Sequence, residues 1–169
     1  MWLKMGYTHH CKHDLCANTD TDMRWATFLY DVAKLSRALN AARLEGHDMG
    51  RVIIHEGARS VEVNGGYEED GSDNDDMTVE VLDVDIDDMM RTDGRGYFFC
   101  KTNRMNYDTA VIVVLFLLRH HFCENDKIVI NTDASTMEEL DDAVFLYRRV
   151  FPAKNDADEL ANHMLNFET

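Results

Sequence analysis

The sequence predicts an α+β fold, a single-domain sandwich in which helices cover a mixed or mostly antiparallel sheet. Residues 18–46 and 135–151 place apolar side chains three and four positions apart, as amphipathic helices do. The stretch 51–102 instead consists of short runs rich in β-branched and aromatic residues. With 169 residues, 45% hydrophobic, one proline and nine glycines, nothing in the composition divides the chain. We expect one domain over 1–169 with an acidic loop or insertion around 67–93.

The first half of the chain is predicted to contain a strand over residues 3–9, a helix over 18–46 and then four strands. Apolar residues at helical spacing define one face of this helix: Trp25, Phe28, Leu29, Val32, Leu35 and Leu39. The four strands are expected at residues 51–56, 60–65, 77–84 and 96–102.

The second half is predicted to alternate helix, strand, helix and helix. Residues 107–122 are read as a helix despite their valines and isoleucines, because about four turns exceed the length of a usual strand. A buried strand over 126–133 precedes a helix over 135–151, which Ser135 and Glu138 open in the spacing of a capping box. A short amphipathic helix over 156–167 ends the chain.

The formal charge of −15, from 32 acidic and 17 basic residues, argues against direct binding to nucleic acids, whose backbones attract clustered Lys and Arg. The expected partners are a small anionic ligand or a host protein. No membrane interaction is expected, because the apolar run Ala110 to Leu118 is far shorter than the roughly 20 residues that cross a bilayer. No secretory signal is visible, so we expect a cytoplasmic protein whose oligomeric state the sequence leaves open.

The stretch MGYTHHCKHDLC, residues 5–16, contains the residue types that bind zinc. Cys11, His13 and Cys16 are the candidate ligands, but a structural zinc site commonly uses two separated pairs, and no second pair occurs elsewhere. If the first strand continues, His9 and His10 point to opposite faces. We therefore expect no cofactor and favour a surface loop with incidental Cys and His, with zinc as the lesser alternative.

The stretch FFCKTNRMNYD suggests an anion site, because a strand ends near Thr102 and a helix begins near Asp108. Free N–H groups at a helix N-terminus favour negative charge, and Lys101 and Arg104 would reinforce this preference. The alternative is that Asp108 only caps its helix and that Lys101 is a solvated residue at the strand end. Neither a P-loop nor a dinucleotide fingerprint is present.

Two further positions are open to more than one interpretation. His120 and His121, near the end of the apolar helix, complement the negative helix C-terminus or belong to a site. Asp133, between a buried strand and a helix, is either a functional carboxylate or an ordinary turn residue.

Several short motifs in order, MGYTHH, VEVNG, FFCKT followed by YD, LLRHHF and a strand ending in TD, resemble an uncharacterised family of small proteins encoded by tailed bacteriophages and related viruses. The resemblance spans roughly residues 5 to 151, and His10 and Cys11 depart from the pattern. It implies a viral accessory protein and brings no assigned activity. The matching positions include an unusual number of polar residues, which suggests that His9, Lys101 and Asp108 converge at one end of the sheet. The polar positions that match are Tyr7, Thr8, His9, Asn64, Cys100, Lys101, Thr102, Tyr107, Asp108, His120 and Asp133.

The leading functional hypothesis is a viral protein that binds a small anionic, nucleotide-like ligand or a host protein, with a role in counter-defence. In this hypothesis Tyr7 and Tyr107 stack on a base while cations and a helix N-terminus hold the anion. The candidate ligand-binding residues are Tyr7, Thr8, His9, Lys101, Thr102, Arg104, Tyr107 and Asp108.

The alternative is an enzyme, a hydrolase or transferase. His9 would be the general base or acid and Cys100 the nucleophile. Lys101 would stabilise developing charge, and Asp108 or Asp133 would orient the base. A structural protein of the virion is a third hypothesis.

Overall fold

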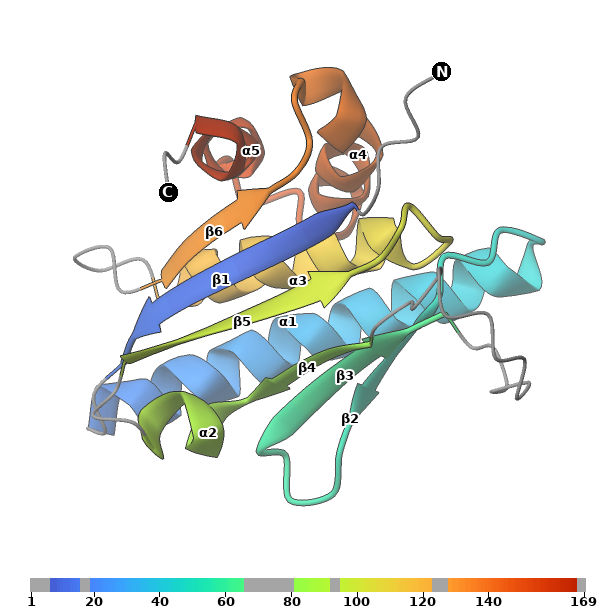
Figure 1. The fold of residues 1–169 in the computed structure, drawn as a ribbon. Helices are drawn as coiled ribbons and strands as arrows, with labels where there is room; N and C mark the ends of the chain where they lie inside the picture. Colours follow the sequence, from blue (N-terminus) through green and yellow to red (C-terminus); the bar gives the residue numbers. More distant parts are fainter. Residues whose placement is uncertain (1–6, 16–18, 66–80, 92–94, 123–127, 167–169) are drawn as a thin grey trace, which may run out of the picture.

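Two antiparallel sheets of three strands each lie beside one another, with the long helices packed behind them (Figure 1). This computed structural model describes residues 7–15, 19–65, 81–91, 95–122 and 128–166. The predicted α+β class is confirmed, as one compact domain.

The elements follow one another in the predicted alternation, with one additional short helix. In chain order they are β1 (Thr8–Asp14), α1 (Thr19–Leu44), β2 (Arg51–Ile54), β3 (Ser60–Asn64), β4 (Leu82–Asp85), α2 (Ile86–Arg91), β5 (Arg95–Lys101), α3 (Asp108–His121), β6 (Ile128–Thr132), the 3-10 helix η2 (Met137–Leu140), α4 (Asp141–Val150) and α5 (Ala157–Asn166).

The first sheet has the order β5-β1-β6, with β1 antiparallel to both neighbours. β5 and β6 are therefore parallel to each other, and α3 connects them across β1. His9 lies opposite Cys100 on one side and Thr132 on the other, and all three are buried. Because side chains alternate along a strand, these residues define an inner face against the helices, and their neighbours in sequence define an outer face.

The second sheet, β2-β3-β4, buries one face in the same core. Val61 and Val63 alternate with the more exposed Ser60 and Glu62 along the predicted strand. The long helix α1 packs against β2 and buries the predicted apolar stripe, of which Leu29 alone is only partly buried.

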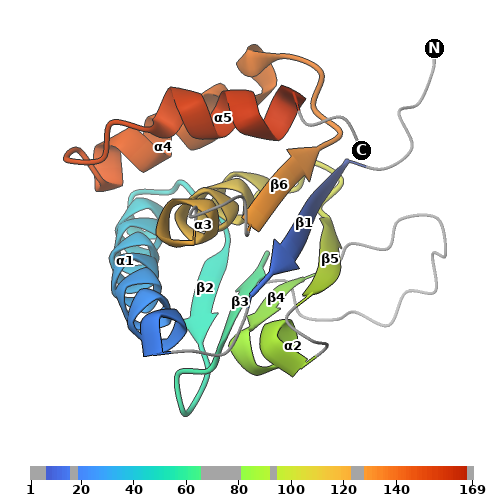
Figure 2. The ribbon, with the colours of Figure 1, turned by 90° about the vertical axis from the view of Figure 1, so that its left-hand side faces the viewer.

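Helix α3 is the centre of the molecule. Its residues Ala110 to Leu118 are all buried, because α1, α4, α5 and β6 surround it (Figure 2). A helix that is apolar on every side is stable only when other elements cover every side. Among the described helices, this one included, none is both long and apolar enough to cross a membrane.

The C-terminal end of α3 is held by a cluster of ionisable side chains. His121 Nε2 lies 2.8 Å from Asp31 on α1, and Lys154 Nζ lies 3.0 Å from the same carboxylate. His120 bonds to Asp156, which also accepts a hydrogen bond from a tyrosine of α4. These histidines therefore connect α3 to α1 and to the segment before α5, beyond the helix-end role considered from the sequence.

The boundaries of β1 differ from the prediction. The described strand covers Thr8–Asp14, while residues 3–6 of the predicted strand lie outside the described residues. Cys11 and His13 therefore belong to a central strand, with buried side chains, and do not lie in a surface loop. The sequence THHCKHD does not show the apolar and polar alternation that predicts a strand. Histidine and cysteine occupy the inward positions that usually carry aliphatic residues.

Two local predictions further along the chain also need correction. The capping box uses Thr136 and Glu139, one residue later than Ser135 and Glu138, and the first turn is a 3-10 helix. Within the expected acidic insertion at 67–93, the described part forms β4 and then α2, whose Ile86 and Met89 are buried. Helix α2 has only six residues, which are too few to show the helical spacing of apolar residues from which a helix is predicted.

Gly50 is a position where we expect substitution to be costly. It has φ +85°, and an added Cβ would lie 2.4 Å from Tyr107 Cβ and 2.6 Å from the Asn64 carbonyl oxygen. Gly50→Ala should lower the free energy of unfolding by roughly 2–4 kcal/mol, through strain and overpacking. Gly57→Ala is the matched control, since φ is +82° with nothing within 4 Å. If urea denaturation showed the same loss of unfolding free energy for both variants, the close contacts at Gly50 would contribute nothing to the cost of its substitution.

The cluster at the end of α3 predicts a loss of stability in acid. Burial lowers the pKa of His121 below its ordinary 6.5. Burial opposes ionisation of Asp31, but hydrogen bonds from His121 and Lys154 outweigh it and lower its pKa below 3.8. In both cases the unfolded state binds more protons, so stability falls as pH decreases from about 6.5. We expect the urea midpoint to drop between pH 7 and pH 5, and to drop less in His121→Gln. If the midpoint of the variant fell with pH as steeply as that of the wild type, His121 would not be the source of the pH dependence.

Candidate functional site

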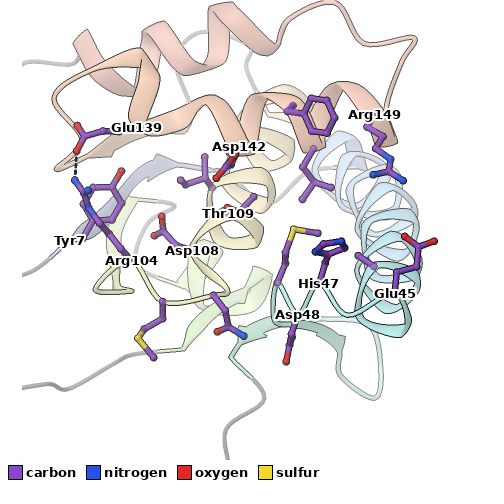
Figure 3. Close-up of a pocket in the computed structure, with 18 residues that line it drawn as sticks. Tyr7, Glu45, His47, Asp48, Arg104, Asp108, Thr109, Glu139, Asp142 and Arg149 are labelled. Carbon is purple, nitrogen blue, oxygen red and sulfur yellow. Dashed lines mark hydrogen bonds and ion pairs between the residues drawn. The ribbon is translucent and has the colours of Figure 1, made fainter.

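A pocket of about 600 Å³ opens beside the carboxyl ends of β5 and β6, where α3 begins. Its walls come from the end of α1, the loop between β5 and α3, the first turn of α3, η2 and α4 (Figure 3). In α/β units, ligands commonly bind outside the carboxyl ends of parallel strands. The size is within the range of small-molecule sites.

Asp108 is the first residue of α3, and two hydrogen bonds hold its carboxylate from the interior. His9 Nε2 lies 2.6 Å from Oδ1, and the Thr102 hydroxyl donates to the same oxygen. Because a carboxylate oxygen only accepts, Nε2 is the nitrogen that carries the proton in this bond. Oδ2 has no hydrogen-bond partner among the described residues, and the side chain is 15% exposed. Asp108 therefore offers one oriented oxygen to the pocket.

His9 supports Asp108 from within the core and does not itself reach the pocket. Its side chain is fully buried, and its Nδ1 lies 2.9 Å from the Thr132 hydroxyl. The Thr132 oxygen also accepts the backbone N–H of Ala134 at 3.1 Å. A chain of polar contacts thus runs from the end of β6 through His9 to Asp108. Both ring nitrogens are engaged, so the imidazole has a single orientation.

Arg104 and Tyr7 form the rim beside Asp108. The guanidinium lies over the Tyr7 ring, 4.5 Å from its centroid, and pairs with Glu139. Glu139 also accepts the backbone N–H groups of Ser135 and Thr136. Burial and then the Asp108 carboxylate raise the pKa of Tyr7 to about 12, so its phenol keeps its proton at neutral pH.

The backbone that carries Arg104 is in an unusual conformation. Asn103 and Arg104 have φ of 49° and 58°, in the left-handed region that residues other than glycine rarely adopt. The N–H groups of Thr102 and Asn103 both donate to the Tyr7 carbonyl, at 3.0 and 3.3 Å. Such conformations persist where the surroundings over-determine them, and they concentrate at functional sites.

The pocket lining carries more negative than positive side chains. At the end away from Tyr7, Figure 3 shows Arg149 near His47 and Glu45. The acidic residues of the lining are Glu45, Asp48, Asp108, Glu139 and Asp142, and the basic ones are His47, Arg104 and Arg149. Since Glu139 neutralises Arg104, Arg149 is the guanidinium left to meet an acidic group of a ligand.

Part of the predicted constellation comes together. β1 and β5 are neighbours, and the pocket or its support includes Tyr7, His9, Thr102, Arg104 and Asp108. Lys101 does not join them. Lys101 of β5 lies opposite Thr8 of β1, next to the pair His9 and Cys100, whose side chains point inward. Because side chains alternate along a strand, Lys101 and Thr8 both point to the outer face of the sheet.

Three further candidates lie away from the pocket. Cys100 is fully buried in the core beside β1 and does not line the pocket, so it cannot contact a substrate there. Tyr107 is also buried, at the start of α3, and presents no ring for stacking. Asp133 closes the end of the β1–β6 ladder, where its carboxylate accepts the Thr8 N–H at 3.0 Å, as a turn residue does.

Of the proposed zinc ligands, the structure describes Cys11 and His13, which both lie on β1. Cys11 is fully buried on the inner face of β1, and burial raises the pKa of its thiol, which opposes the thiolate that binds metal. Within the described ranges, no group of three or more His, Cys, Asp and Glu residues could hold a metal ion. Cys16 lies outside the described residues.

Sequence reasoning missed the contributions of α1 and α4. Asp142 and Arg149 line the pocket from α4, and His47 lines it from the segment after α1. The spacing of Asp142 and Arg149 marks only an exposed helix face, and His47 follows the end of a helix, so no local signal identified these three residues. Thr132 was missed as the partner of His9, although it directly precedes the candidate Asp133.

Comparisons of the chain with protein-family models, with curated proteins and with solved structures find no match. Function must therefore be inferred from the site, since a fold class by itself defines none.

The support of Asp108 by His9 can be tested with two adjacent histidines. His9→Leu removes both ring contacts from a fully buried position and should lower the free energy of unfolding by roughly 2–4 kcal/mol. His10→Leu makes the same change on the opposite face, where the side chain is 30% exposed, and should cost less than about 1 kcal/mol. Comparable losses in urea denaturation would contradict the supporting role of His9.

Proposed function

We propose that the protein binds a small polar molecule in the Asp108 pocket, one that carries an acidic group together with amino or hydroxyl donors. The observation that carries this proposal is the Asp108 carboxylate: His9 and Thr102 fix one oxygen, and the other is left toward the pocket. An acceptor oriented in this way selects for a donor on the ligand, because a ligand without one would displace water from the carboxylate oxygen and leave that oxygen unpaired.

The charges of the lining narrow the ligand class. A purely anionic ligand would meet the repulsion of Asp108 and Asp142, whereas a ligand with an amino group gains a charge-assisted hydrogen bond. Its acidic group would pair with Arg149 at the other end of the pocket. The anionic ligand expected from the sequence thereby becomes a molecule with both kinds of group, such as an amino-sugar phosphate.

The test is a ligand-induced thermal shift with a defined pair of probes, glucosamine phosphate and glucose phosphate, followed by titration calorimetry. We expect glucosamine phosphate to stabilise the protein more. Asp108→Asn keeps the size of the side chain and should weaken binding by roughly 10-fold or more. Arg149→Gln should weaken it similarly.

Arg148→Gln is the matched control, because Arg148 is the adjacent residue of α4 and pairs with Asp158 outside the pocket. Binding that is unaffected by Asp108→Asn and Arg149→Gln, or reduced equally by all three changes, would refute the proposed pocket. A lack of binding by both probes would remove the amino-sugar phosphates as a ligand class.

A second candidate function is hydrolysis or group transfer in the same pocket, with Asp108 as a general base. The observation in its favour is the buried contact of His9 with a carboxylate at the start of a helix, next to two residues in left-handed conformations. Asp108 would remove a proton from a bound hydroxyl or water, while Tyr7, protonated at neutral pH, would donate a hydrogen bond to the developing anion.

Binding and catalysis make different predictions for one variant. If Asp108 is a general base, Asp108→Asn should lower the turnover of a bound phosphate ester by about 100-fold or more while the complex still forms. Phosphate release and NMR spectra of the probe measure this difference. A bound probe that stays chemically unchanged with the wild-type protein would favour the non-enzymatic function.

The viral origin implied by the resemblance stays a prediction, and so do counter-defence through a host protein, a place in the virion and cytoplasmic location. The Asp108 pocket is compatible with the accessory role and does not depend on it.

A further inference from the structure

The outer face of the sheet β5-β1-β6 carries a group of aromatic side chains. None of the described helices lies over this face, since α1 and α3 pack on the other side (Figures 1 and 2). Tyr97 and Phe99 are each 51% exposed, which is unusual for large side chains in the middle of a strand. His10 lies beside them, with ring centroids 5.7 Å from Tyr97 and 6.4 Å from Phe99.

Contacts within the group fix the orientation of two rings. Tyr97 and His10 are nearly parallel, with 25° between their planes, and the Tyr97 hydroxyl contacts His10 Nδ1. The other ring nitrogen, Nε2, faces Asp133 at 3.8 Å. The aromatic surface is therefore preorganised on rigid strands, so a ligand would not have to order it.

A pocket of about 430 Å³ adjoins these rings, between β1 and the end of β6. Tyr97 and His10 form one wall, Lys12 supplies a cation, and Asn131 and Asp133 supply polar groups. In the register of the two strands, Lys12 pairs with Tyr97, and Lys101 pairs with Thr8 next to Phe99. Two of the six lysines in the chain thus stand at the two ends of the aromatic row.

We propose that this outer-face pocket binds a free nucleoside monophosphate, whose base stacks on Tyr97 and His10 and whose phosphate pairs with Lys12. Aromatic side chains on an open sheet are a recurrent stacking surface for bases. The Asp133 carboxylate is an acceptor for ribose hydroxyls. Lys101, expected from the sequence to bind an anion, adds a second cation beside Phe99. This proposal is independent of the Asp108 pocket, which lies behind the same sheet.

The occupant is a single nucleotide and not a strand of nucleic acid. A formal charge of −15 repels a polyanion over many contacts, whereas one phosphate needs only local cations, because charges beyond about 8 Å are screened at physiological salt. The pocket volume also suits one base and its sugar, being near the lower end of small-molecule sites.

The experiment is titration calorimetry of the full chain with three probes: adenosine monophosphate, adenosine and ribose phosphate. We expect the monophosphate to bind best. Tyr97→Leu should weaken both probes that contain a base by roughly tenfold or more, as the loss of a stacking partner does. Lys12→Gln should weaken the monophosphate and leave adenosine unchanged. Since Tyr97 is half exposed, the variant should fold, which its melting temperature checks.

Tyr30→Leu is the matched control, because Tyr30 is a surface tyrosine, 64% exposed, with a lysine ammonium 4.6 Å from its ring centroid, on α1 instead of the sheet. The proposal is overturned if the monophosphate does not bind, if ribose phosphate binds equally well, or if Tyr30→Leu and Tyr97→Leu weaken binding equally. Loss of nucleotide binding in Asp108→Asn with no effect of Tyr97→Leu also overturns it, and assigns the nucleotide to the Asp108 pocket. Failure on the outer face would leave the amino-sugar proposal standing.

Discussion

The fold depends on the burial of one helix that has no polar side. From Ala110 to Leu118 every residue of α3 is buried, so the other helices and the sheets must enclose it completely. Burial of a large aliphatic or aromatic side chain contributes about 1.5–3 kcal/mol relative to exposure, so the enclosure of α3 is a major source of stability. The two ends are the points where polar groups can meet it, and a histidine pairs with a carboxylate at each: His9 with Asp108, and His121 with Asp31.

The same constraint determines where the pocket lies. β5 ends at Lys101 and α3 starts at Asp108, so the short loop between them must turn from the sheet into the core within six residues. The left-handed conformations of Asn103 and Arg104 accomplish this turn, and they place the arginine over Tyr7. The pocket thus lies where the central helix begins, with residues of its neighbours α1 and α4 among its lining.

Periodicity predicted α1 and α4, whereas α3 was predicted from the length of its apolar run, since a helix that is buried on every side shows no apolar stripe. The approach of His9 to Asp108 was predicted from the polar positions that match the family pattern, and the pairing of β1 with β5 brings the two residues together. Lys101 was placed with them although it lies one position from Cys100, and in a strand one position decides the face. β1 itself was misplaced because its inward residues are His9, Cys11 and His13. Helix α4 contributes Arg149 through tertiary packing, which no local pattern encodes.

Adjacent residues of the first sheet serve opposite surfaces. His9 and His10 are neighbours in β1, and so are Thr132 and Asp133 at the end of β6, with one member of each pair toward the core and the other outward. The two surfaces therefore share a single layer of backbone. If molecules bind on both sides, a displacement of β1 by one of them would also change the other site, and thermodynamic reciprocity would make the change in affinity equal in both directions. Two binding sites on opposite faces of one sheet would then be coupled through the strands that they share. Such coupling would need neither a hinge nor a second domain.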